Sequence, residues 1–316
     1  MRTSIALGAF ALLLLGGKDL RAEVPASATG GGADFSVAGQ NDQDKPPARE
    51  IPFETINWSL ADDKSVSEVG KIALGLNAGD WKTCQTEHFI VHFRRQTEAR
   101  RVARQIEFDL WFVAKALGFS KKDYAMTSHV YVFEGTAEWQ SFLHKADMPD
   151  WVAAFARGDE LFLNVRGSGG DRDTGESQIA HETTHAVVAR LYPRQQWPLW
   201  LNEGMAEYMS SASVAARRGK FVGRLQNSME MGLLPLDELV TMEQYPADTT
   251  KVAMLYRTSE ALVRYLHEAH GTEKFREFIQ TMVTGKSLKD TIAQVYPNDY
   301  KDWDAFEAAY RAKILK

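Results

Sequence analysis

Apolar residues change their spacing about halfway along the chain. In the first half, three short runs rich in β-branched and aromatic residues predict strands, at 87–93, 129–133 and 160–165. Apolar residues three or four positions apart predict a helix at 97–117, which Gly118 ends, and a shorter helix at 137–145. This half is therefore expected to form a small mixed sheet with helices.

The second half shows helical spacing alone. Its apolar periodicity predicts helices at 176–191, 198–211, 253–270, 273–284, 287–295 and 300–314. Strands followed by helices indicate an α+β architecture. We expect one folded domain over 56–316 with two lobes, an N-terminal lobe at about 86–192 and an all-helical C-terminal lobe at about 196–316.

The first residues have the pattern of an export signal. Arg2 precedes an apolar stretch at 5–15, which is too short to span a bilayer, and Leu20-Arg21-Ala22 fits a cleavage site. We expect a signal peptide at 1–22 and a bacterial protein that is periplasmic or secreted. The alternative is an uncleaved N-terminal membrane anchor. Residues 23–55, rich in Ala, Gly, Pro, Asp and Gln, predict a disordered linker.

Composition and charge are those of an ordinary soluble protein. The 316 residues are 44% hydrophobic and 25% charged, with a net charge of −5. Because there is no basic block, a nucleic-acid partner is not expected, and no membrane span is expected beyond the signal segment. The single cysteine, Cys84, cannot form an intrachain disulfide and is expected to be a buried thiol.

The candidate chemistry begins at His181-Glu182-Thr183-Thr184-His185. Two histidines four residues apart lie on one face of a helix and can share a metal ion, with Glu182 beside the ion and suited to holding a water molecule. Asp173, three residues before Glu176, predicts the N-terminal cap of this helix. The alternative is a pair of histidines satisfied by hydrogen bonds.

A second segment, Trp200-Leu201-Asn202-Glu203-Gly204-Met205-Ala206-Glu207-Tyr208, predicts an acidic helix. A catalytic zinc ion takes three protein ligands and keeps one open position, so a third ligand must come from another element. The 17 residues between His185 and Glu203 allow the first helix to end and the chain to reverse. If Glu203 binds zinc, Glu207 can hydrogen-bond a ligand histidine.

These two segments resemble those of the gluzincins, and more closely those of bacterial peptidase MA-like domains, in which a Trp-Leu-x-Glu-Gly-x-Ala-Glu-Tyr segment follows HExxH. The resemblance extends from about Thr86 to the C-terminus. It implies a zincin-like fold and one Zn²⁺ per chain, bound by His181, His185 and Glu203, with Glu182 as the catalytic base. It also implies that the strand at 160–165 is the sheet edge to which a peptide substrate adds.

Two related zinc arrangements do not fit. A metzincin carries glycine and histidine at the third and sixth positions after the second histidine, where this chain has Val188 and Leu191. The aminopeptidase group carries a Gly-x-Met-Glu-Asn motif before HExxH, which residues 166–170 do not match. Aminopeptidase specificity is therefore not indicated.

The remaining candidate residues are a tyrosine and two histidine pairs. Tyr256 is the candidate donor to the reaction's oxyanion, and a packing role is the alternative. His88 and His92 lack a carboxylate at a suitable spacing and are expected at the surface. The pair His267 and His270 is interpreted as the end of a helix rather than a second metal site.

Together these features predict an exported zinc metallopeptidase that acts on a peptide or protein substrate. The mechanism would be attack by a zinc-activated water with Glu182 as general base. Two alternatives stay open. One is a catalytically silent zincin-fold binding protein. The other is a zinc hydrolase that acts on a non-peptide amide or ester.

Overall fold

The computed structural model describes residues 45–48, 50–165, 172–219 and 232–314, with no side chains described at 172–174. The predicted signal peptide, most of the predicted linker and the whole segment 166–171 lie outside these ranges. The described chain contains no helix that is long and apolar enough to cross a membrane. Strand β1 (Glu54–Ile56) begins within the segment predicted as linker, so the folded domain starts earlier than predicted.

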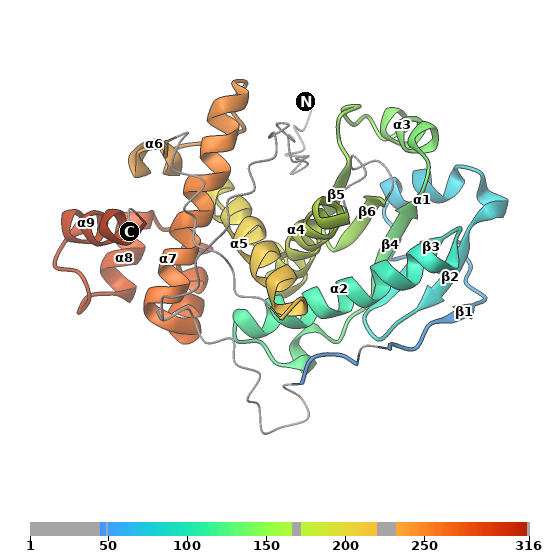
Figure 1. The fold of residues 1–316 in the computed structure, drawn as a ribbon, viewed down its shortest axis with the longest axis horizontal. Helices are drawn as coiled ribbons and strands as arrows, with labels where there is room; N and C mark the ends of the chain where they lie inside the picture. Colours follow the sequence, from blue (N-terminus) through green and yellow to red (C-terminus); the bar gives the residue numbers. More distant parts are fainter. Residues whose placement is uncertain (1–44, 49, 166–171, 220–231, 315–316) are drawn as a thin grey trace, which may run out of the picture.

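A six-stranded mixed sheet organises the N-terminal half (Figure 1). The strands lie in the order β1-β2-β3-β4-β6-β5, where the central pairs β3–β4 and β4–β6 are parallel and the outer pairs are antiparallel. The other strands are β2 (Lys82–Gln85), β3 (Phe89–Phe93), β4 (Ser128–Phe133), β5 (Ala154–Arg157) and β6 (Glu160–Asn164). The three predicted strands are β3, β4 and β6, the three that form the parallel pairs.

The prediction that the strand at 160–165 forms the sheet edge is wrong. β6 pairs with β4 on one side and with β5 on the other, so β5 is the edge strand. The cause is a two-residue turn, in which Gly158 adopts a positive φ of 60° that a residue with a side chain rarely adopts. The chain therefore enters β6 from a hairpin, and β5 covers the outer side of β6.

Helices cover both faces of the sheet. On one face, Tyr131 and Phe133 pack with α1 (Glu68–Gly75) and α3 (Thr136–Lys145). On the other face, Val130 and Val132 belong to the main core with α2 (Gln96–Ala116) and α4 (Arg172–Leu191). This alternation follows from the two-residue period of a strand. Cys84 lies fully buried in the main core, as predicted, and α2 ends just before Gly118, which has a positive φ.

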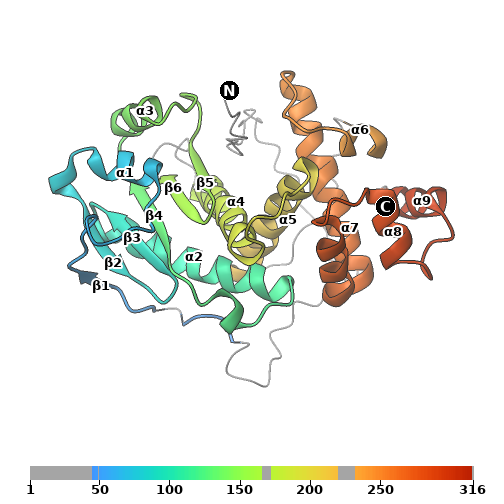
Figure 2. The same cartoon turned by 180° about the vertical axis from the view of Figure 1, so that it is seen from behind.

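The C-terminal half of the described chain is helical, and Figure 2 shows it at the end of the molecule opposite β1. Its helices are α5 (Leu199–Arg217), α6 (Leu236–Val240), α7 (Thr249–Met282), α8 (Leu288–Val295) and α9 (Trp303–Ile314). Gly271 breaks α7 with a positive φ, near the boundary between the two predicted helices. The fold is thus α+β, and one hydrophobic cluster extends from the sheet through α4 and α5 to α9.

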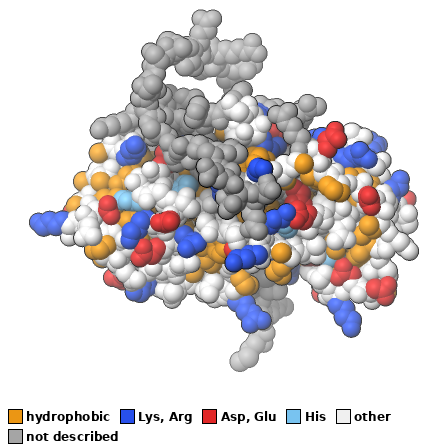
Figure 3. All heavy atoms as spheres, turned by 90° about the horizontal axis from the view of Figure 1, so that it is seen from below, with side chains coloured by type: hydrophobic (Ala, Val, Ile, Leu, Met, Phe, Trp, Pro, Cys, Tyr) orange, Lys and Arg blue, Asp and Glu red, His pale blue; other side chains and the backbone are white. Residues whose placement is uncertain are grey.

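The described surface carries charges of both signs. Figure 3 shows lysine and arginine side chains interspersed with aspartate and glutamate on one face, and apolar side chains scattered between them. Three large apolar side chains are exposed among the described residues, Leu60, Met126 and Trp151, and they are far apart in the sequence. Single apolar side chains scattered over a charged surface are normal in folded proteins and need no functional explanation.

Candidate metal centre

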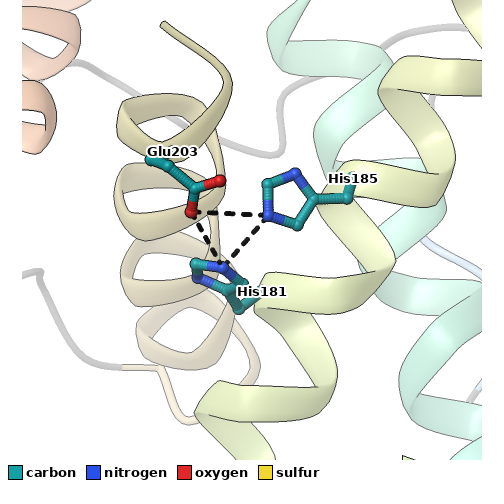
Figure 4. Close-up of side chains that lie close together, drawn as sticks. All are labelled: His181, His185 and Glu203. Atoms are coloured by element: carbon teal, nitrogen blue, oxygen red, sulfur yellow. Dashed lines mark hydrogen bonds and ion pairs between the residues drawn. The ribbon is translucent and has the colours of Figure 1, made fainter. Parts of the chain in front are cut away.

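Three side chains converge between α4 and α5 (Figure 4). The Nε2 atoms of His181 and His185 lie 3.1 Å apart. Oε2 of Glu203 lies 3.6 Å from Nε2 of His181 and 3.7 Å from Nε2 of His185. One potential ligand atom from each residue falls within 4.8 Å of the other two. This donor set, two imidazoles and a carboxylate, is one that binds zinc.

The local sequence explains how α4 presents its histidines. A four-residue spacing puts both on one helix face, while the hydroxyls of Thr183 and Thr184 donate back to the carbonyls of Ile179 and Ala180 one turn earlier. Both threonines are buried without leaving an unsatisfied hydroxyl. The helix begins at Arg172, earlier than predicted, so Asp173 lies in its first turn and is not the cap.

Close packing of two helices positions Glu203. Pro198 precedes the first turn of α5, as its fixed φ favours. A Cβ built on Gly204 would lie 2.7 Å from the carbonyl carbon of Ser259 on α7, so only glycine fits at this position. The helices α5 and α7 can therefore approach closely, and Glu203 is only 1% exposed between them and α4.

The electrostatics of the centre favour a cation. Burial opposes the charge of Glu203, but His185 and His181 outweigh that effect and hold the pKa of its carboxyl well below the usual range. Its Oε2 atom has no hydrogen-bond partner among the described residues, although it is buried and faces two ring nitrogens. A buried acceptor aimed at two nitrogen ligands is satisfied by a metal ion, so the residues fit one.

Glu207 contacts His181 from the far side of the ring. Its Oε1 atom lies 3.1 Å from Nδ1 of His181, one helical turn beyond Glu203. Burial lowers the pKa of His181, but Glu203 and Glu207 raise it well above its ordinary value. An acidic partner on Nδ1 leaves Nε2 directed at the centre, which is the arrangement common among metal-binding histidines.

Glu182 is buried beside these residues and is 2% exposed. Burial raises the pKa of its carboxyl from 4.5 to about 7, despite the opposing effects of His181 and His185. The backbone amide of Ala156, on the edge strand β5, donates a hydrogen bond to it. A carboxyl group with a pKa near neutrality can accept and release a proton during a reaction.

Two tyrosines approach the centre, and sequence analysis identified one of them. The ring of Tyr256 on α7 has its centroid 6.3 Å from that of His181. Tyr245, in the segment between α6 and α7, donates a hydrogen bond of 2.6 Å to Oε1 of Glu203. No spacing in the sequence links Tyr245 to the HExxH segment, so no pattern could have identified it.

The other histidines have structural partners. The prediction that His88 and His92 lie at the surface is wrong, because both are buried. Nδ1 of His88 lies 2.7 Å from Oε2 of Glu107 on α2, a partner 19 residues away that no local pattern reveals. His92 bonds to His129 on the neighbouring strand. His267 and His270 bond to the hydroxyls of Tyr208 and Tyr300, respectively.

Comparison with known proteins adds two findings. Residues 117–315 match the Peptidase MA superfamily, and this range includes both α4 and α5. A 144-residue stretch is 28% identical to a protein named "Probable aminopeptidase 2" from Sulfurisphaera tokodaii. That match covers 42% of this chain and 18% of the relative, so the chain corresponds to a small part of that protein's length.

Proposed function

Because the chain belongs to the Peptidase MA superfamily, we propose that it is an exported zinc-dependent peptidase with Glu182 as its general base. The observation that carries the proposal is the convergence of His181, His185 and Glu203 beside a buried glutamate of raised pKa. Export rests on the signal segment predicted at 1–22.

Each residue of the centre has a distinct proposed role. Nε2 of His181, Nε2 of His185 and Oε2 of Glu203 would hold one zinc ion, and Glu207 would orient His181. When bound, zinc lowers the pKa of a water molecule toward about 7 and polarises the scissile carbonyl. Glu182 takes a proton from the attacking water and delivers it to the leaving amine. Tyr256 donates to the developing oxyanion.

The outer edge of β5, the last strand of the described sheet, supports a peptide as the substrate. The amide of Asn164 donates to the carbonyl of Ala153, so the next residue, Ala154, and then Ala156 direct their backbone groups away from β6. An extended peptide can hydrogen-bond to such an edge. Since the Ala156 amide contacts Glu182, a peptide on this edge would pass beside the proposed base.

The position of the cleaved bond is a separate question. The relative from Sulfurisphaera tokodaii is named as an aminopeptidase, whereas residues 166–170 lack the amine-binding motif of that group. Paired peptides with free and acetylated N-termini separate the two possibilities. Equal cleavage of both forms indicates an endopeptidase, and loss of cleavage on acetylation indicates an aminopeptidase.

Metal analysis combined with a substitution tests the proposal. We expect one zinc ion per chain in both the wild type and Glu182→Gln, since Glu182 is not a ligand. Wild type should digest a mixed-peptide library, and the variant should be slower by at least about 100-fold. Zinc binding without cleavage of any peptide would indicate a silent binding protein, and cleavage of only non-peptide amides or esters would indicate another hydrolase.

A further inference from the structure

The two carboxylate oxygens of Glu203 have different surroundings. Oε1 accepts from the tyrosine hydroxyl at 2.6 Å. Oε2 has no hydrogen-bond partner in the described chain and faces Nε2 of both histidines, at 3.6 and 3.7 Å. One oxygen is thus held by the protein, and the other is available to a cation.

A glutamate has three rotatable side-chain bonds, so burial alone does not decide which oxygen faces a ligand. A buried carboxylate also requires partners for its lone pairs. Tyr245 supplies such a partner from a segment that contains no other residue of the centre, and a tyrosine keeps its proton at neutral pH. Its donor therefore fixes the rotation of the carboxylate about its last bond.

We propose that Tyr245 is a positioning residue that holds Glu203 as a one-oxygen metal ligand and so keeps a coordination position open for water, an inference that rests on the proposed zinc site. A carboxylate that binds through both oxygens occupies two positions around the ion. A catalytic zinc site needs three protein ligands and one open position. By keeping Oε1 engaged, Tyr245 prevents the second oxygen from taking that position.

The test compares Tyr245→Phe with wild type and a matched control. Phenylalanine keeps the ring and removes only the hydroxyl. Tyr310→Phe is the control, because it removes a hydroxyl that is buried on α9 and has no hydrogen-bond partner among the described residues. Each protein is stripped of metal, its zinc affinity is measured by competition with a chromophoric chelator, and its cobalt(II) form is examined by visible absorption.

We expect Tyr245→Phe to bind zinc about 10-fold to 100-fold more weakly, the usual effect of losing a hydrogen bond to a ligand. Its cobalt bands should weaken, as they do when the coordination number rises above four, while the control matches wild type. If Tyr245→Phe has the zinc affinity and the cobalt bands of wild type, the inference is overturned and the proposed function stands. If wild type itself binds neither metal, the proposed zinc site fails.

A second measurement needs no variant and covers the case in which Tyr245→Phe does not fold. In a crystal structure of the zinc-loaded wild type, Glu203 should bind through Oε2 alone, with the Tyr245 hydroxyl about 2.7 Å from Oε1. Binding of zinc by both oxygens, or displacement of Tyr245 from Oε1, would contradict the proposal.

Discussion

Replacement of Gly204 by alanine tests whether the packing of α5 on α7 sets the geometry of the metal centre. The added Cβ would lie 2.7 Å from the carbonyl carbon of Ser259 and 2.8 Å from Cγ2 of Val263, and closer still to the Ser259 oxygen. The Ser259 atoms belong to the backbone and cannot rotate away. The two helices would have to separate by roughly 1 Å to restore normal contact.

Two opposing terms set the effect on stability. Alanine favours a helix over glycine by about 1 kcal/mol. Overpacking a core typically costs about 1–3 kcal/mol, and contact with a rigid backbone puts this case at the upper end. We therefore expect Gly204→Ala to lower the free energy of unfolding by about 1–2 kcal/mol. Because α7 also carries Tyr256, the same shift should reduce peptidase activity by up to about 100-fold.

Urea denaturation of wild type, Gly204→Ala and Gly75→Ala measures this effect. Gly75 ends α1, and a Cβ built on it meets nothing within 4 Å, so its replacement should be neutral or stabilising by up to about 1 kcal/mol. If Gly204→Ala is as stable as Gly75→Ala, close packing does not position Glu203 and the reasoning fails.

Three further predictions concern buried charges and the metal. In metal-free protein, the raised pKa of Glu182 means that the native state keeps a proton that the unfolded chain releases, so stability should fall as pH rises from about 4.5 to about 7. Glu182→Gln should flatten that slope in urea titrations at several pH values, and an identical slope would exclude this assignment. Glu107→Ala leaves His88 without its buried partner and should cost about 3–5 kcal/mol by urea denaturation, whereas Glu68→Ala removes a largely exposed pair and should cost less than about 1 kcal/mol. Chelation of zinc should lower thermal stability by about 4 kcal/mol when zinc had been present at about 1,000 times its dissociation constant, and an unchanged melting temperature would argue against a bound metal.

The features best predicted from the sequence depend on residues that lie close together along the chain. A four-residue spacing on a helix brings His181 and His185 together whatever the tertiary fold, and the apolar runs of β3, β4 and β6 reflect strands buried on both faces. The missed strands β1, β2 and β5 have three or four residues each, with exposed or partly exposed positions, and too few residues to show a period.

Long-range partners could not be predicted for a different reason. Tyr245 reaches Glu203 across 42 residues, and His92 reaches His129 across 37. A lone tyrosine in a turn-rich segment or a lone histidine in a strand has the same local pattern whether it is buried or exposed. Only the packing of α7 against α5, or of β4 against β3, decides which of these side chains meet a partner.

The positions of the centre's residues along the sequence have a consequence for synthesis of the protein. The groups around the centre are spread from Ala156 on β5 to Tyr256 on α7, and the chain leaves the ribosome from its N-terminus. An unfinished polypeptide presents both histidines before it has the tyrosines or the helix that packs against Gly204. A complete set of these groups is thus available only once the last third of the chain has been made.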